Sequence, residues 1–283
     1  MAQFDGKLCV ITGGTSGIGL AAAEKFARLG ADLVIVGHDP ARGAAASARL
    51  SSLRPGVRVT VVLADLALLA EQRRVASALS ALPRIDVLLN NAGAIFTRRE
   101  ETADGLERTF ALNHMNYYVL TRLLEPKLRA SAPMRIVNVA SGAHRGARLD
   151  LGDLQMRRRF DGWLAYRNSK LCNILFTREL ARRLVGSGVT ANSLHPGFVA
   201  TRFGDNNRGL FRAGIAIAKR ITALPVEKGA ETSVYCATAP ELEGVTGLYF
   251  GNCRPDAPTA AAQDDAMALR LWQESARIAG LPA

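Results

Sequence analysis

Tyr166 and Lys170 are four positions apart in the segment AYRNSKLCNILFTREL. Residues at positions i and i+4 of a helix share a face, so the phenol and the ammonium can point into one site. A neighbouring cation favours phenolate, and we expect Lys170 to lower the pKa of the Tyr166 phenol from about 10 toward the working range of a general acid/base. A pair at this spacing also arises by chance, so its meaning depends on the rest of the chain.

The segment TGGTSGIG, residues 12–19, is a glycine-rich turn between an apolar strand and an amphipathic helix. We expect Gly13 to adopt a positive φ, Gly17 to let the backbone approach a phosphate, and Gly19 to permit close packing of helix on strand. The helix N-terminus then offers free N–H groups and a partial positive charge to a pyrophosphate. The alternative is an ordinary tight turn. A dinucleotide cradle and a tunable tyrosine together predict hydride transfer to or from a carbonyl.

Short apolar runs alternate with amphipathic segments along the chain. Strands are predicted at 7–12, 31–37, 57–64, 85–93, 134–141 and 188–197, with a weaker seventh at 245–250. Helices are predicted at 17–29, 40–53 and 66–79. This alternation predicts an α/β fold with a doubly wound, Rossmann-type parallel sheet. No linker-like stretch divides the sequence, so we expect a single domain over 1–283 with a substrate-lid insertion at about 198–225.

The chain of 283 residues is 48% apolar and carries a formal charge of +11, with arginine supplying 30 of its 36 cations. The arginines are dispersed, which predicts a solvated basic surface and no nucleic-acid binding. No apolar run reaches the ~20 residues that span a bilayer, and the N-terminus lacks a secretory signal pattern, so a cytoplasmic protein is expected. The four cysteines and four histidines show no metal-ligand spacing, which predicts reduced thiols and no metal site.

Several motifs occur in the order seen in the short-chain dehydrogenase/reductase family, and on them the chain resembles that family. They are Thr12-Gly-x-x-x-Gly-x-Gly19, Asn90-Asn-Ala-Gly93, Asn113, Ser141, Tyr166-x-x-x-Lys170 and Pro196-Gly197. The stretches at 164–184 and 261–281 look most like the retinol-dehydrogenase-type branch. The resemblance implies an enzyme that uses NAD(P)(H).

The resemblance also implies a role for each reacting group. Tyr166 would exchange a proton with the substrate oxygen, and Lys170 would lower its pKa and hold the nicotinamide ribose. Ser141 would hydrogen-bond the substrate oxygen, although a serine can also merely end a strand. Asn113 would kink its helix and anchor a water that links Lys170 to solvent, or it is an ordinary polar helix residue. Its segment NHMNYY departs from the family pattern.

A set of cofactor contacts follows from the same resemblance. Asn90 to Gly93 would steady the sheet beside the adenine side of the cofactor, Asp65 and Leu66 would border the adenine, and Thr201 would bond the nicotinamide carboxamide. The predicted cofactor-binding residues are Gly13, Thr15, Ser16, Gly17, Ile18, Gly19, His38, Arg42, Asp65, Leu66, Asn91, Ala92, Gly93, Tyr166, Lys170, Pro196, Gly197, Val199 and Thr201.

The end of the second strand bears on cofactor choice. NAD-selective sites usually place an acid there, and that acid repels a 2′-phosphate. The position falls here at Gly37, followed by His38, with Arg42 nearby. NADP(H) is therefore favoured over NAD(H), while Asp39 and the lack of an arginine at position 38 count against it. His38 can also be a plain solvated loop residue.

Residues 201–225 combine apolar side chains with cations. Such a segment suits a lid over an apolar pocket, a peripheral membrane contact, or simple helix packing on the core. With the branch resemblance it favours a lipophilic substrate, retinoid-like or otherwise apolar. Cys172 fits a small buried hydrophobe, but a cysteine here is also similar to the light-dependent protochlorophyllide reductases of the same superfamily.

We therefore predict an NADP(H)-preferring oxidoreductase that interconverts an alcohol and an aldehyde or ketone, with a small molecule as its partner. One alternative is a sensor that binds NADP(H) without turnover, because a fold does not dictate a function. Others are a protochlorophyllide-reductase-like enzyme and a membrane-surface interaction protein. Formation of a homo-oligomer is left open by the sequence.

Overall fold

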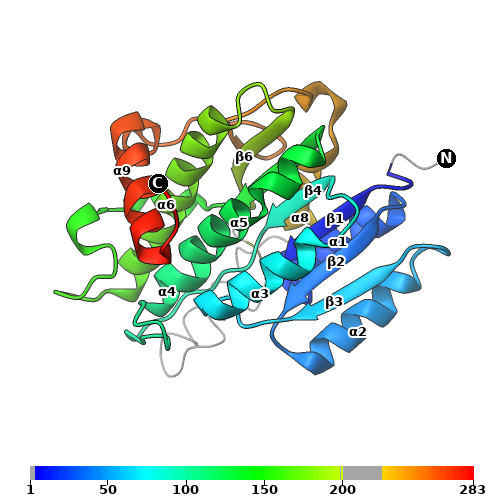
Figure 1. Cartoon of the computed structure of the whole chain (residues 1–283), viewed down its shortest axis with the longest axis horizontal. Helices are drawn as coiled ribbons and strands as arrows, with labels where there is room; N and C mark the ends of the chain where they lie inside the picture. The colour runs from blue at the N-terminus through cyan, green and yellow to red at the C-terminus, as the bar shows by residue number, and fades with distance from the viewer. Residues whose placement is uncertain (1–3, 198, 200–224) are drawn as a thin grey trace.

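The computed structural model describes residues 4–197, 199 and 225–283, and their strands form one eight-stranded sheet (Figure 1). The strand order is β3-β2-β1-β4-β5-β6-β7-β8, with parallel pairing throughout except for antiparallel β8. The order reverses direction between β1 and β4, which places a crevice at the carboxyl ends of these strands. The strands are β1 (Leu8–Thr12), β2 (Asp32–Gly37), β3 (Val59–Leu63), β4 (Val87–Asn90), β5 (Met134–Val139), β6 (Val189–His195), β7 (Tyr249–Gly251) and β8 (Arg254–Pro255).

Helices cover both faces of the sheet because alternate strand residues are apolar on each side. Val10, Leu88 and Ile136 share one apolar cluster with α3 (Leu69–Ser80), α5 (Asn116–Ala130), α6 (Gly162–Arg183) and α9 (Asp265–Ala279). Ile11 and Leu89 share a second cluster with α1 (Gly17–Arg28), α2 (Pro40–Ser51) and α8 (Val226–Thr238). A short α4 (Arg108–Phe110) and a π-helical turn (Ala111–Met115) lead into α5. The predicted doubly wound α/β fold is confirmed.

Some boundaries differ from the sequence prediction. The predicted strand at 245–250 begins only at Tyr249, because Gly247 has φ +79 and interrupts the extended backbone. Strand β8 and helices α5, α8 and α9 were not predicted. The lid segment at about 198–225 lies outside the described residues apart from Val199 and Pro225. The single-domain organisation stays a prediction.

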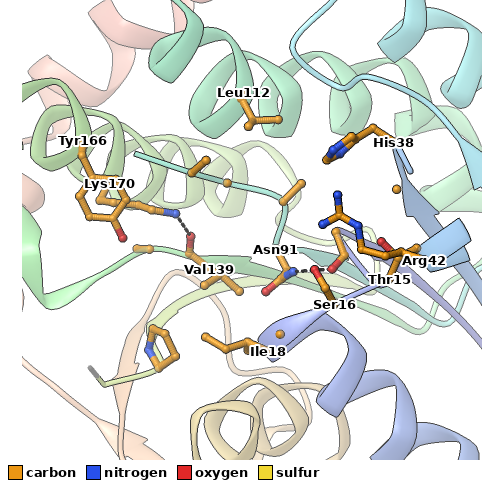
Figure 2. A pocket seen from close by; sticks show the side chains of 18 residues that line it. Thr15, Ser16, Ile18, His38, Arg42, Asn91, Leu112, Val139, Tyr166 and Lys170 are labelled. Atoms are coloured by element: carbon orange, nitrogen blue, oxygen red, sulfur yellow. Dashed lines mark hydrogen bonds between the residues drawn. The ribbon is translucent and has the colours of Figure 1, made fainter. Parts of the chain in front are cut away.

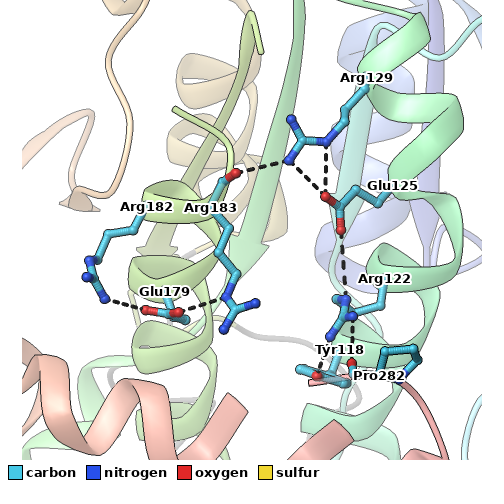
Figure 3. Close-up of polar contacts among 8 residues, drawn as sticks. All are labelled: Tyr118, Arg122, Glu125, Arg129, Glu179, Arg182, Arg183 and Pro282. Carbon is cyan, nitrogen blue, oxygen red and sulfur yellow. Dashed lines mark hydrogen bonds and ion pairs between the residues drawn. The ribbon is translucent and has the colours of Figure 1, made fainter. Parts of the chain in front are cut away.

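Arginines on the α5 and α6 surfaces are paired with carboxylates (Figure 3). Glu125 bonds Arg129 at 2.8 Å, and Glu179 accepts from Arg182 and Arg183 at 2.7 Å each. These ion pairs neutralise several arginines locally on this side of the molecule. Among the helices that the structure describes, none is both long and apolar enough to cross a bilayer.

Candidate active site

A cavity of about 270 Å³ lies at the carboxyl ends of the central strands (Figure 2). Tyr166 and Lys170 stand at one end, and His38 and Arg42 stand at the other. A second hollow of about 450 Å³ shares His38 and Arg42 and continues to Asp65 and Leu66. The predicted cofactor residues that line the first cavity are Gly13, Thr15, Ser16, Gly17, Ile18, His38, Arg42, Asn91, Ala92, Gly93, Tyr166, Lys170 and Pro196.

The glycine turn has the geometry that the sequence predicts. Gly13 has φ +67, and a Cβ on Gly19 would lie 2.3 Å from the Gly13 carbonyl oxygen, so α1 packs on β1 more closely than a larger residue allows. Ser16 precedes α1 without a side-chain cap bond among the described residues, and the first turn holds no acidic residue. The amide groups at this helix end are therefore suited to an anion such as a pyrophosphate.

The loop after β4 is tied directly to the glycine turn. The Thr12 hydroxyl accepts from the backbone N–H of Asn91 at 2.9 Å and of Ala92 at 3.1 Å. The Asn91 side chain donates to the Thr12 carbonyl at 2.9 Å. Asn90 points the other way and donates to Asn138 on β5 at 2.9 Å. The bonds between Thr12 and Asn91–Ala92 fix the glycine turn relative to the loop after β4, and both segments line the cavity.

Helix α6 carries both reacting side chains, and its start is fixed by Asp161, which accepts from the Leu164 N–H at 2.8 Å. Tyr166 is 9% exposed and Lys170 is 4% exposed. Lys170 Nζ donates to the Val139 carbonyl at 3.0 Å and lies 5.7 Å from the centroid of the Tyr166 ring. Ser141 follows β5 and hydrogen-bonds Tyr166, so three of the four predicted reacting groups lie together.

The expected lowering of the Tyr166 pKa is not found. Burial raises the pKa of the Tyr166 phenol to about 12, partly offset by the Ser141 hydrogen bond. Burial also lowers the pKa of the Lys170 amine to about 7. Desolvation disfavours the charged form of both groups, and Lys170 directs its N–H to Val139. The sequence showed the pairing of the two side chains but not the degree to which α6 is buried.

Asn113 lies in the π-helical turn and is completely buried. Its side chain accepts from the Ala94 N–H at 2.8 Å and donates to the Ser169 hydroxyl at 3.0 Å. Its carbonyl accepts from Asn173 at 2.9 Å. Asn173 was missed by the sequence analysis, although its position three residues after Lys170 puts it on the same helix face.

His38 and Arg42 form the far end of the cavity, where β2 leads into α2. Asp39 caps α2 by accepting from the Arg42 N–H at 3.0 Å, and it also holds Arg42 Nε at 2.6 Å. Asp39 therefore partly neutralises the Arg42 charge and fixes the position of the guanidinium group.

Other predicted residues do not line the cavity. Ser141 bonds Tyr166 without itself lining the cavity, Asn113 lies next to Gly93, and Gly19 acts through helix packing. Gly197 is exposed, and Val199 is buried against Gly229. Thr201 lies outside the described residues. In the part of the chain that the structure describes, no three metal-ligating side chains cluster together.

Comparison with known proteins agrees with this geometry. Residues 7–209 match the family model described as short chain dehydrogenase. The chain is 38% identical to retinol dehydrogenase 13 of Homo sapiens, over 100% of this chain and 87% of that protein. Its structure is similar to a protein from Mycobacterium paratuberculosis, with a TM-score of 0.79, 32% identity, and coverage of 99% and 96% of the two chains.

A short-chain dehydrogenase from Sphingobium yanoikuyae, solved in complex with NADPH, is also similar in structure. The TM-score is 0.66 and the identity 30%, over 81% of this chain and 82% of that one. The family match, the full-length relative and the shared fold lead to one conclusion. This chain belongs to the short-chain dehydrogenase family and is similar to its retinol dehydrogenase members.

Proposed function

We propose that this protein is an NADP(H)-dependent oxidoreductase that interconverts an alcohol and an aldehyde or ketone, with a lipophilic substrate. The observation that carries the proposal is that one cavity has an anion-binding helix end and glycine turn on one side and the Tyr166–Lys170 pair on the other. Their arrangement fits a dinucleotide lying along the carboxyl ends of the strands. When bound, the nicotinamide supplies or accepts the hydride.

The side chains of this site then handle the proton and the charge. The raised pKa of Tyr166 keeps its phenol protonated at neutral pH, which is the form that donates a proton to a substrate oxygen during carbonyl reduction. The Ser141 hydroxyl, bonded to Tyr166, is placed to hold the same oxygen. Lys170 supplies positive charge beneath the phenol when it is protonated.

The choice of NADP(H) rests on the end of β2. A Cβ on Gly37 would lie 2.5 Å from the Thr15 hydroxyl oxygen, so an acidic side chain does not fit there without a shift of Thr15. Arg42 and His38 line the adjacent wall and suit a phosphate. The pairing of Arg42 with Asp39 weakens this preference without reversing it.

The lipophilic substrate is supported by Trp163. Its indole is 38% exposed, although most residues of α6 are buried. The ring packs edge-on to Tyr166, with centroids 6.1 Å apart and planes at 82°. An aromatic surface beside the acid/base residue fits the apolar part of a substrate.

The test is oxidation of NADPH and NADH with a panel of aliphatic, aromatic and retinoid aldehydes, comparing wild type with Tyr166→Phe. We expect turnover to fall at least 100-fold in the variant, because the substitution removes only the proton donor. Equal turnover in both proteins would refute the acid/base role. NADPH binding without turnover of any aldehyde would favour the sensor alternative.

Three further expectations accompany this proposal. The cytoplasmic location and the oligomeric state stay predictions. A membrane contact through 201–225 also stays a prediction, since that segment lies almost wholly outside the described residues.

A further inference from the structure

The carbonyl oxygen of Val139, at the end of β5, is shared by three buried side chains. It accepts from Lys170 Nζ at 3.0 Å, from the Tyr117 hydroxyl at 3.3 Å, and from Asn173 Nδ2 at 3.5 Å. Two of these donors come from α6 and one from α5. A carbonyl oxygen has two lone pairs, so three donors compete for it.

Tyr117 is the second residue of α5. Its side chain is completely buried, and Lys170 Nζ lies 5.8 Å from its ring centroid. The distance from Nζ to the Tyr166 ring is 5.7 Å, so the amine lies at similar distances from two tyrosine rings. Because Tyr117 is fully buried and does not line the cavity, it approaches Lys170 from the protein interior.

Among the residues that the structure describes, no other charged side chain acts on the Lys170 amine. Gly93 closes the cavity side, where an added Cβ would lie 3.4 Å from Nζ and 3.1 Å from the Asn113 side-chain oxygen. The titratable groups around the amine and its partner phenol are Tyr117, Tyr166 and Tyr249. Burial lowers the pKa of the Lys170 amine, and the hydrogen bond to Val139 is the interaction that favours its ammonium form.

We propose that Tyr117 is a positioning residue that competes with Lys170 for the Val139 carbonyl and so keeps the amine free to turn toward Tyr166 and the cofactor ribose. The proposal rests on the proposed function. A hydroxyl that donates to the same oxygen weakens the bond from Nζ and reduces the stabilisation of the ammonium form. Tyr117 thereby helps to hold the titration of Lys170 near neutral pH.

The test is Tyr117→Phe, which removes the hydroxyl and keeps the ring. Without the competing donor, the Val139 carbonyl stabilises the ammonium more strongly, so the pKa of Lys170 rises. We expect the loss of kcat/KM above neutral pH to move upward by about half a pH unit to one pH unit, the equivalent of one hydrogen bond. If Tyr117 only filled space, its replacement would change kcat/KM equally at all pH values. The pH at which kcat/KM falls would then stay the same.

Tyr118→Phe is the matched control. Tyr118 is the next residue on α5 and is equally buried, but its hydroxyl accepts from Arg122 at 2.6 Å (Figure 3). We expect its pH profile to coincide with that of wild type. An equal shift in both variants would overturn the proposal, because it would indicate a general loosening of α5.

A second readout does not need turnover. In the Tyr166→Phe background, NADPH binding measured by cofactor fluorescence reports on Lys170 without the phenol, and the His38 end of the cavity is the same in all variants. Adding Tyr117→Phe should move the weakening of NADPH binding to higher pH by a similar amount. An unchanged binding profile would refute the role of Tyr117, whereas a shifted one without aldehyde turnover in wild type would refute only the proposed reaction.

Discussion

Replacement of Lys170 by methionine should stabilise the cofactor-free protein while it removes activity. Lys170 is 4% exposed, and burial lowers its pKa from an ordinary value of 10.5 to about 7. Methionine has similar length and no charge to desolvate. The Val139 carbonyl that Lys170 leaves behind still accepts from Tyr117, so no acceptor is stranded.

The magnitude follows from the same values. The unfolded chain binds the Lys170 proton more tightly than the folded chain, so wild-type stability rises between pH 7 and pH 10.5. At pH 6 the full difference applies and amounts to about 5 kcal/mol, at 1.36 kcal/mol for each pH unit. Loss of the hydrogen bond from Nζ to Val139 lowers the expected gain in unfolding free energy by about 1 kcal/mol, and relaxation of the protein around the charge lowers it further. We expect Lys170→Met to gain about 2–4 kcal/mol at pH 6.

The assay is urea unfolding at pH 6 and pH 9.5, followed by circular dichroism, with reversibility checked by refolding. The advantage of Lys170→Met should shrink to about 1 kcal/mol or less at pH 9.5, because the folded lysine is neutral there and only about one pH unit separates this pH from the unfolded pKa. A variant that is less stable than wild type at both pH values would refute the reasoning. A gain of equal size at both values would show that packing, rather than charge burial, is responsible.

Two further predictions concern recognition. Arg42→Ala should raise the KM for NADPH about 3- to 10-fold and leave the KM for NADH nearly unchanged, because it removes the cation proposed to bind the 2′-phosphate while Asp39 remains. Steady-state kinetics with both cofactors measure this effect. An equal rise in KM for both cofactors would contradict a phosphate contact. Trp163→Ala should lower kcat/KM about 10-fold for long apolar aldehydes and less than about 3-fold for short ones, because it removes aromatic surface beside Tyr166. A series of aldehydes of increasing chain length tests this prediction. Trp163→Phe serves as the control and should retain most of the activity.

The sheet and the phosphate turn could be predicted from the sequence because both depend on local patterns. The residues of Leu8–Thr12 and the glycines that follow allow few other conformations. Helices such as α9 were harder to predict, because their apolar residues are stabilised by packing on another helix that the local sequence does not reveal. Trp272 of α9, for example, stacks on Phe176 of α6, with ring centroids 5.9 Å apart.

The candidate site was predictable in its residue types and less so in its electrostatics. Motif order identified Tyr166, Lys170 and Ser141, which lie together in the structure. The pKa directions depend on how much protein surrounds α6, and no local pattern carries that information. Asn173 and Tyr117 were missed for a related reason, since each acts through a backbone carbonyl distant in sequence.

The edges of the sheet bear on how this chain behaves at high concentration. At one edge, β8 has only two residues, and Pro255 has no N–H to offer a further strand. At the other edge, Arg74 of α3 bonds the Leu63 carbonyl at the end of β3, which occupies an acceptor that an added strand would use. Both edges thus discourage strand addition between molecules. A protein that must partly open around a buried site can therefore do so with less risk of aggregation by edge-to-edge pairing.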